Sequence, residues 1–83
     1  MTTTELFKTA DLALAAVLML MLPDWLLSVD KSNPKRVIFA FRKGPEIESL
    51  TRKYWSRELL VEPQAFANEI KQAKVRIYNQ DPI

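Results

Sequence analysis

The chain has 83 residues, of which 48% are hydrophobic and 27% are charged, and its formal net charge is +2. These values are typical of one small globular domain, 1–83, and a domain of this length buries only about 60–65% of the surface that its unfolded chain exposes. The chain contains no cysteine and no histidine, which excludes disulfides, thiolate nucleophiles and the commonest general base and zinc ligand. The lack of cysteine fits a reducing, cytoplasmic setting.

The longest apolar run covers residues 12–22, LALAAVLMLML, and contains no polar side chain. A helix over this run would span about 16 Å, roughly half of a ~30 Å hydrocarbon core, and Pro23 and Asp24 close it. A signal peptide would need a basic leader and a small-residue cleavage site, whereas Glu5 and Asp11 precede the run. We therefore predict a buried core helix and no membrane segment.

This helix is expected to run from about residue 10 to residue 21. Thr9 is a good N-cap, and Asp11 in the first turn would favour the positive end of the helix dipole. Pro23 ends the helix, because the residue before a proline is pushed towards extended geometry. The preceding residues, 1–8, form a polar lead-in that we expect to be loosely ordered.

The predicted helix is apolar on every face, whereas a surface helix has one polar side. One interpretation is a helix sandwiched between a sheet and other helices. The other is that a second copy of the protein covers one face, and the shortness of the chain favours this homodimer. The residues that we assign to the core or to the oligomer contact are Leu12, Ala16, Met19 and Leu20.

An antiparallel β-hairpin is predicted next. Residues 25–30 form a first strand, 31–35 a turn rich in Ser, Asn and Pro, and 36–42 a second strand rich in Val, Ile and Phe. The second strand has apolar residues on both faces, so we expect it to be covered on both sides.

Two further helices follow, over 45–56 and 63–78, each with a proline at its first position and the second with Glu62 as its cap. Residues 59–61 form a short extended piece that would serve as a third strand, and residues 79–83 are expected to be loosely ordered. The predicted fold is a small single α+β domain of order α-β-β-α-(β)-α. Its helices pack on a hairpin or on a three-stranded antiparallel sheet.

The acidic residues do not form a convincing catalytic set. Glu46 and Glu48 are two positions apart at a helix start and do not face each other. Without histidine or cysteine, a hydrolase would need a Ser–Lys or carboxylate arrangement, and no spacing suggests one. We expect no enzymatic activity, no cofactor and no metal.

The central part of the chain, 31–57, carries eight basic residues against two acidic ones. Such a block could contact phosphates, which dominate non-specific nucleic-acid affinity, and the neighbouring Tyr54 and Trp55 could stack on bases. The alternative is that the basic side chains are solvated and that both aromatic residues belong to the core. The candidate nucleic-acid contacts are Lys31, Lys35, Arg36, Arg42, Lys43, Arg52, Lys53 and Arg57.

Three blocks of the sequence resemble a family of small proteins that is catalogued as a domain of unknown function and occurs in phages, prophages and related bacteria. The blocks are FKTADLALAA over 7–16, NPKRVIFAF over 33–41 and YWSRELLVEPQAF over 54–66. The resemblance implies a phage or mobile-element setting, and it assigns no activity or site residue.

These observations predict a non-enzymatic binding protein of phage or mobile-element type. It would bind nucleic acid, or act as a regulator, through the basic block. The alternative is a protein–protein interaction module, such as a modulator of a host enzyme, that acts through apolar surface. The expected partners are a second copy of the chain and either DNA or a host protein, with no membrane and no small-molecule substrate.

Overall fold

The computed structural model describes residues 5–33 and 35–78, and it confirms a small, mixed α+β domain. The expectations for residues 1–4 and 79–83 therefore lie outside the described residues. Within this part of the chain the elements are β1 (Leu6–Thr9), α1 (Leu12–Met21), the 3-10 turn η1 (Pro23–Trp25), β2 (Leu26–Asp30), β3 (Ile38–Arg42), α2 (Pro45–Ser56) and α3 (Pro63–Tyr78).

The three strands form one antiparallel sheet in the order β1-β3-β2. The pairing of β2 with β3 confirms the predicted hairpin, and its register is shifted by an irregularity between Leu26 and Ser28. The third strand is β1, whereas residues 59–61 form no strand and only connect α2 to α3. The central strand β3 pairs with β2 along one edge. Along its other edge it pairs with the N-terminal segment and not with the α2–α3 connection.

Strand β1 corrects the expectation that residues up to Lys8 are loosely ordered. Phe7 pairs with Phe41 and packs against the core, whereas Leu6 and Lys8 are exposed. The alternation of one inward and one outward side chain is therefore present, but it extends over only four residues. A pattern this short cannot be distinguished from a polar lead-in by sequence alone.

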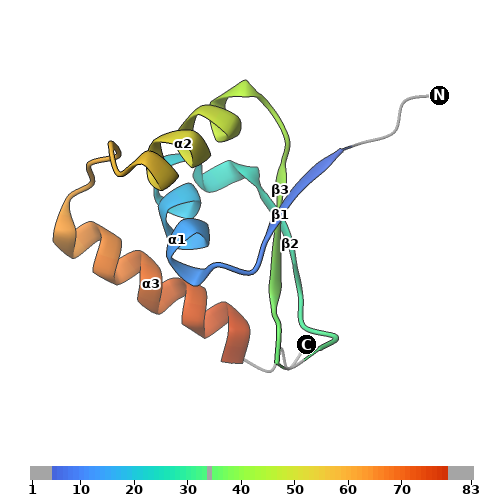
Figure 1. Ribbon diagram of the computed structural model, residues 1–83. Coiled ribbons are helices and arrows are strands. Elements are labelled where there is room, and N and C mark those ends of the chain that lie inside the picture. The colour runs from blue at the N-terminus through green and yellow to red at the C-terminus, as the bar shows by residue number, and fades with distance from the viewer. Residues whose placement is uncertain (1–4, 34, 79–83) are drawn as a thin grey trace.

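The described helices all lie on one side of the sheet (Figure 1). The core between the two layers contains Phe39 and Phe41 of β3 together with Leu18 of α1, Ile47 of α2 and Ala73 of α3, all nearly inaccessible to solvent. The opposite face of the sheet has no helix over it (Figure 1).

Helix α1 begins two residues later than predicted, and its cap is Asp11, not Thr9. The Leu14 backbone N–H donates to Asp11 Oδ1 at 3.1 Å, and the Asp11 N–H donates to Thr9 Oγ1 at 3.0 Å. The shorter side chain of Thr9 is placed in strand β1 and can reach only the N–H of Asp11. Asp11 therefore takes the capping role that the sequence suggested for Thr9, and Thr9 lies outside the helix.

The sandwiched arrangement predicted for the apolar helix is confirmed. Helix α1 packs against α3, α2, η1 and β1, and the residues from Leu14 to Met19 are buried within a single chain. Ala16 and Met19 are among them, whereas Leu12 and Leu20 are partly covered. A second copy of the protein is therefore not needed to cover these four residues, and the homodimer stays a prediction. Among residues 5–33 and 35–78, no helix has the length and apolar character needed to cross a bilayer.

The starts of α2 and α3 are as predicted. Pro45 is the first residue of α2, and Pro63 the first of α3. The Glu62 carboxylate accepts hydrogen bonds from the N–H groups of Gln64 and Ala65, at 3.1 and 2.7 Å, and so caps α3. Helix α2 ends at Ser56, and its C-cap residue Arg57 adopts the left-handed conformation with φ 67°.

Candidate nucleic-acid interface

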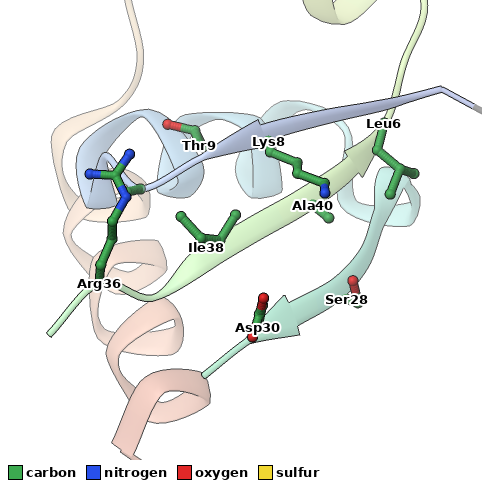
Figure 2. A pocket seen from close by; sticks show the side chains of 9 residues that line it. Leu6, Lys8, Thr9, Ser28, Asp30, Arg36, Ile38 and Ala40 are labelled. Carbon is green, nitrogen blue, oxygen red and sulfur yellow. The ribbon is translucent and has the colours of Figure 1, made fainter. Parts of the chain in front are cut away.

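The uncovered face of the sheet is built by the outward-facing residues of its three strands. Because side chains alternate along a strand, Phe39 and Phe41 face the helices while Ile38 and Ala40 face the other way. Lys8 lies beside Ala40 through the β1–β3 pairing. Figure 2 shows these side chains together with those of β2 on the side away from the helices.

This face contains a hollow of about 300 Å³ that is open to solvent. Ile38 and Ala40 form its apolar floor, while Lys8 and Arg36 contribute cations and Asp30 a carboxylate at its rim (Figure 2). Ser28, Thr9, Leu6 and Ala10 complete the lining. The hollow thus combines an apolar base with charged and hydrogen-bonding side chains, which is the usual composition of a binding site.

Asp30 is the acidic residue in the lining of the hollow. The Ser32 backbone N–H donates to Asp30 Oδ1 at 2.9 Å, and this hydrogen bond is the main reason why the pKa of Asp30 lies below its ordinary value. A hydrogen bond from the Ser32 side chain and the charge of Lys8 lower this pKa further. Asp30 is therefore an anion at neutral pH and acts as a hydrogen-bond acceptor only.

The hairpin loop positions Arg36 at the end of the hollow. Asn33 holds the loop from both its side chain and its backbone: Oδ1 accepts from the Lys35 N–H, and the carbonyl oxygen accepts from the Arg36 N–H, both at 3.0 Å. Asparagine commonly forms such local turns. The loop therefore presents Lys35 and Arg36 beside the start of β3.

The structure separates the predicted basic residues into three groups. Lys31, Lys35 and Arg36 lie in the exposed hairpin loop, and Arg42 and Lys43 lie at the other end of β3. With a rise of about 3.3 Å per residue, the two ends are roughly 20 Å apart. The third group, Arg52, Lys53 and Arg57, lies on α2 or at its end, in the helical layer.

The basic residues at the end of β3 already have partners within the chain. The Arg42 guanidinium lies 4.2 Å from the ring centroid of Trp25, within the range of a cation–π contact. Lys43 Nζ lies 3.3 Å from Glu5 Oε1 in an exposed ion pair. Such pairs are weak in water, so both side chains can exchange these partners for a phosphate.

The two aromatic residues of α2 have different environments. Tyr54 is half-buried, and its hydroxyl donates to Asp11 Oδ2 at 3.3 Å; burial and the charge of Asp11 raise the pKa of Tyr54. Trp55 is 64% exposed and contacts Tyr54 edge-to-face, with ring centroids 4.9 Å apart. The assignment of Tyr54 to the core is thus supported, and that of Trp55 is wrong.

Lys8 is the basic residue of this surface that sequence reasoning missed, and Asp30 was missed as well. The signal for Lys8 was the Leu-Phe-Lys-Thr alternation of β1, which places Lys8 on the outer face. With Lys8 included, the sheet and its hairpin (5–9 and 26–43) carry six basic residues against two acidic ones. The remainder of the described chain (10–25 and 44–78) carries six basic residues against seven acidic ones. The positive charge is therefore concentrated in the sheet layer.

Comparison with known proteins places the chain in a family. No curated protein and no solved structure matches the chain. The model of the family described as "Domain of unknown function (DUF5659)" matches residues 4–79. The match covers most of the sequence, and the protein therefore belongs to this family.

Proposed function

We propose that the protein is a non-enzymatic nucleic-acid-binding protein, and that its binding surface is the uncovered face of the sheet together with the hairpin loop. The observation that carries the proposal is the concentration of positive charge in the sheet layer, six basic residues against two acidic ones. The outer face of this layer is also free of a helical cover (Figure 1). Phosphate groups are the general partners of such a surface.

The proposed contacts differ from the central basic block of the sequence. Lys8 joins them because β1 places it in the hollow with Arg36. The proposed contacts do not include Arg52, Lys53 and Arg57, because these residues belong to α2 and its end, in the helical layer. The proposed phosphate contacts are Lys8, Lys31, Lys35, Arg36, Arg42 and Lys43.

The test is binding of labelled single-stranded and double-stranded DNA over a series of salt concentrations. Each phosphate contact contributes about 0.9 to the slope of log K against log salt for duplex DNA and about 0.7 for a single strand. We expect the double variant Lys8→Gln/Arg36→Gln to lower this slope by about 1.4–1.8 and to weaken binding at low salt by more than tenfold.

The matched control is Arg52→Gln/Lys53→Gln, which removes the same charge from α2. We expect its affinity and slope to stay close to those of the unaltered protein. The proposal is wrong if the unaltered protein binds no nucleic acid at low salt. It is also wrong if the two double variants lose affinity equally, because binding would then follow net charge and not the sheet face.

The setting of this activity is part of the proposal. The three sequence blocks that resemble a phage and prophage family support a phage or mobile-element origin, and the absence of cysteine supports a cytoplasmic location. A small protein that binds nucleic acid without acting as an enzyme would serve as a regulator of a process that uses that nucleic acid.

A second candidate function is protein–protein interaction, with a second copy of the chain or a host protein as partner. It is favoured by an apolar groove of about 550 Å³ where α1 ends and α2 begins. Met21, Leu22, Pro45 and Leu50 supply most of its lining, and Met21 is 44% exposed. This groove lies outside the sheet face, so the two functions can be tested separately.

A further inference from the structure

We infer that the hollow of the sheet face holds one unstacked base of a single-stranded nucleic acid and prefers a base that carries an exocyclic amino group. This inference rests on the proposed function and specifies it. It is carried by the shape of the hollow and by the position of Asp30, Lys8 and Arg36 around its apolar floor (Figure 2).

The shape of the surface favours a single strand over a duplex. A protein reads duplex DNA by inserting a protruding helix or two-stranded ribbon into the major groove. Here the charged side chains surround a depression of about 300 Å³, and its floor is Ile38 and Ala40. The bases of a duplex are paired and stacked, so a base must be flipped out at a cost in free energy before it can enter a depression, whereas the bases of a single strand can be splayed out without unpairing.

The residues that line the hollow can contact both a base and its neighbouring phosphates. The half-buried Ile38 side chain offers an apolar surface to the face of the base, and the buried Ala40, 4% exposed, completes the floor. Lys8 and Arg36 come from different segments, β1 and the hairpin, so they can contact phosphates on either side of the same nucleotide. These contacts are independent of base identity.

Asp30 provides the discrimination between bases. As an anion that only accepts hydrogen bonds, it favours the amino groups of cytosine, adenine or guanine. Thymine and uracil instead place carbonyl oxygens on both sides of their N3–H, and these oxygens repel a carboxylate. One oxygen, Asp30 Oδ1, accepts the Ser32 N–H of the hairpin turn. Recognition of the base is assigned to the same carboxylate, which would otherwise only oppose phosphate binding at a basic surface.

The experiment measures the fluorescence anisotropy of short labelled oligomers at low salt and neutral pH. The probes are oligo-deoxycytidine, oligo-deoxythymidine, the two matching ribose oligomers and a hairpin duplex. We expect the unaltered protein to bind the cytidine oligomer about five- to tenfold more tightly than the thymidine oligomer, and more tightly than the duplex. The ribose oligomers distinguish RNA from DNA as the source of the single strand.

Two variants separate base recognition from charge. Asp30→Ala is expected to bring the cytidine-to-thymidine ratio to about 1. If Asp30 only repelled phosphates, the variant would instead tighten binding to both oligomers and leave their ratio unchanged. Ala40→Leu fills the hollow without changing the charge, and we expect it to weaken single-strand binding about tenfold. Its control is Ala67→Leu, the same change on the exposed surface of α3.

The outcomes distinguish the two proposals. Equal affinity of the unaltered protein for both oligomers, or tighter binding of the duplex, would overturn the base site but leave the proposed function intact. Absence of binding to every probe would overturn both. An Ile38→Tyr variant gives an independent test that does not depend on a loss of function: an aromatic floor should strengthen single-strand binding about fivefold or more through stacking, with no gain for the duplex.

Discussion

Asp11 joins two elements through one carboxylate. Its Oδ1 accepts the Leu14 N–H and so caps α1, and its two oxygens accept the Tyr54 hydroxyl of α2, at 3.4 and 3.3 Å. An N-cap contributes about 1 kcal/mol to helix stability, and its loss leaves an N–H group without a partner. A single side chain therefore fixes where α1 begins and how α2 lies beside it.

Gly44 is required by the close approach of Trp25. Its φ of 177° is extended backbone that any residue can adopt. A Cβ at this position would lie 3.0 Å from two ring carbons of Trp25, whose indole packs against the core and under the Arg42 guanidinium. The space beside the tryptophan, and not the backbone conformation, is what favours glycine here.

We therefore expect Gly44→Ala to lower the free energy of unfolding by about 1–2 kcal/mol, because the indole must shift from its packed position. Denaturation in urea measures the change. In a Trp25→Leu background the same substitution should cost much less, since the ring atoms that the Cβ meets are gone. An equal cost in both backgrounds would show that the indole contact is not the cause.

Helix α1 is the element around which the fold is built. It is apolar on every side, and the other elements cover it from several directions, so that Ala15, Ala16 and Leu18 have no accessible surface. Small alanines let α1 approach its neighbours closely. A helix of this composition is stable only where water is excluded from all of its faces.

The burial of α1 predicts a severe effect of Ala16→Glu. The carboxylate would be placed where the side chain is 0% exposed, and an unpaired charge in such a site costs several kcal/mol. We expect the Tm, measured by circular dichroism, to fall by more than about 10 °C, or the variant to be unfolded. Ala67→Glu, on the exposed side of α3, should change the Tm by no more than a few degrees. A folded Ala16→Glu variant of unchanged Tm would contradict the burial.

The whole molecule consists of two layers with different charge. The two layers lie side by side (Figure 1). The sheet layer is positive and open on its outer face, whereas the helical layer is close to neutral and carries the apolar groove at Met21 and Leu50. A nucleic acid and a protein partner would therefore approach different surfaces. This separation permits both proposed functions in one small domain.

The oligomeric state is a testable property of the whole molecule. The homodimer expected from the sequence would now use the groove, because the faces of α1 are covered within one chain. We expect sedimentation velocity to give a dimer, and Met21→Glu to give a monomer, because it replaces an apolar contact and adds a second carboxylate to a groove that Glu46 already lines. Val75→Glu is the control, since Val75 is 51% exposed on α3 and does not line the groove. A monomer at all concentrations would contradict the homodimer.

Elements with strong local signals could be predicted from the sequence alone. The apolar run and Pro23 predicted α1, and the residues around Asn33 predicted the hairpin. The prolines at 45 and 63 marked the starts of α2 and α3. These features are local because periodicity, turn formation and capping depend on residues that are close together in the chain.

Features that depend on residues far apart in the chain became visible only in the three-dimensional structure. Only the pairing of β1 with β3 shows that Phe7 is a core residue and that Lys8 lies in the hollow with Arg36. Likewise, only the two-layer arrangement separates the basic residues of the sheet from those of α2. Residue spacing cannot reveal these relations, because strand partners and the layer that a charged side chain joins are set by long-range packing.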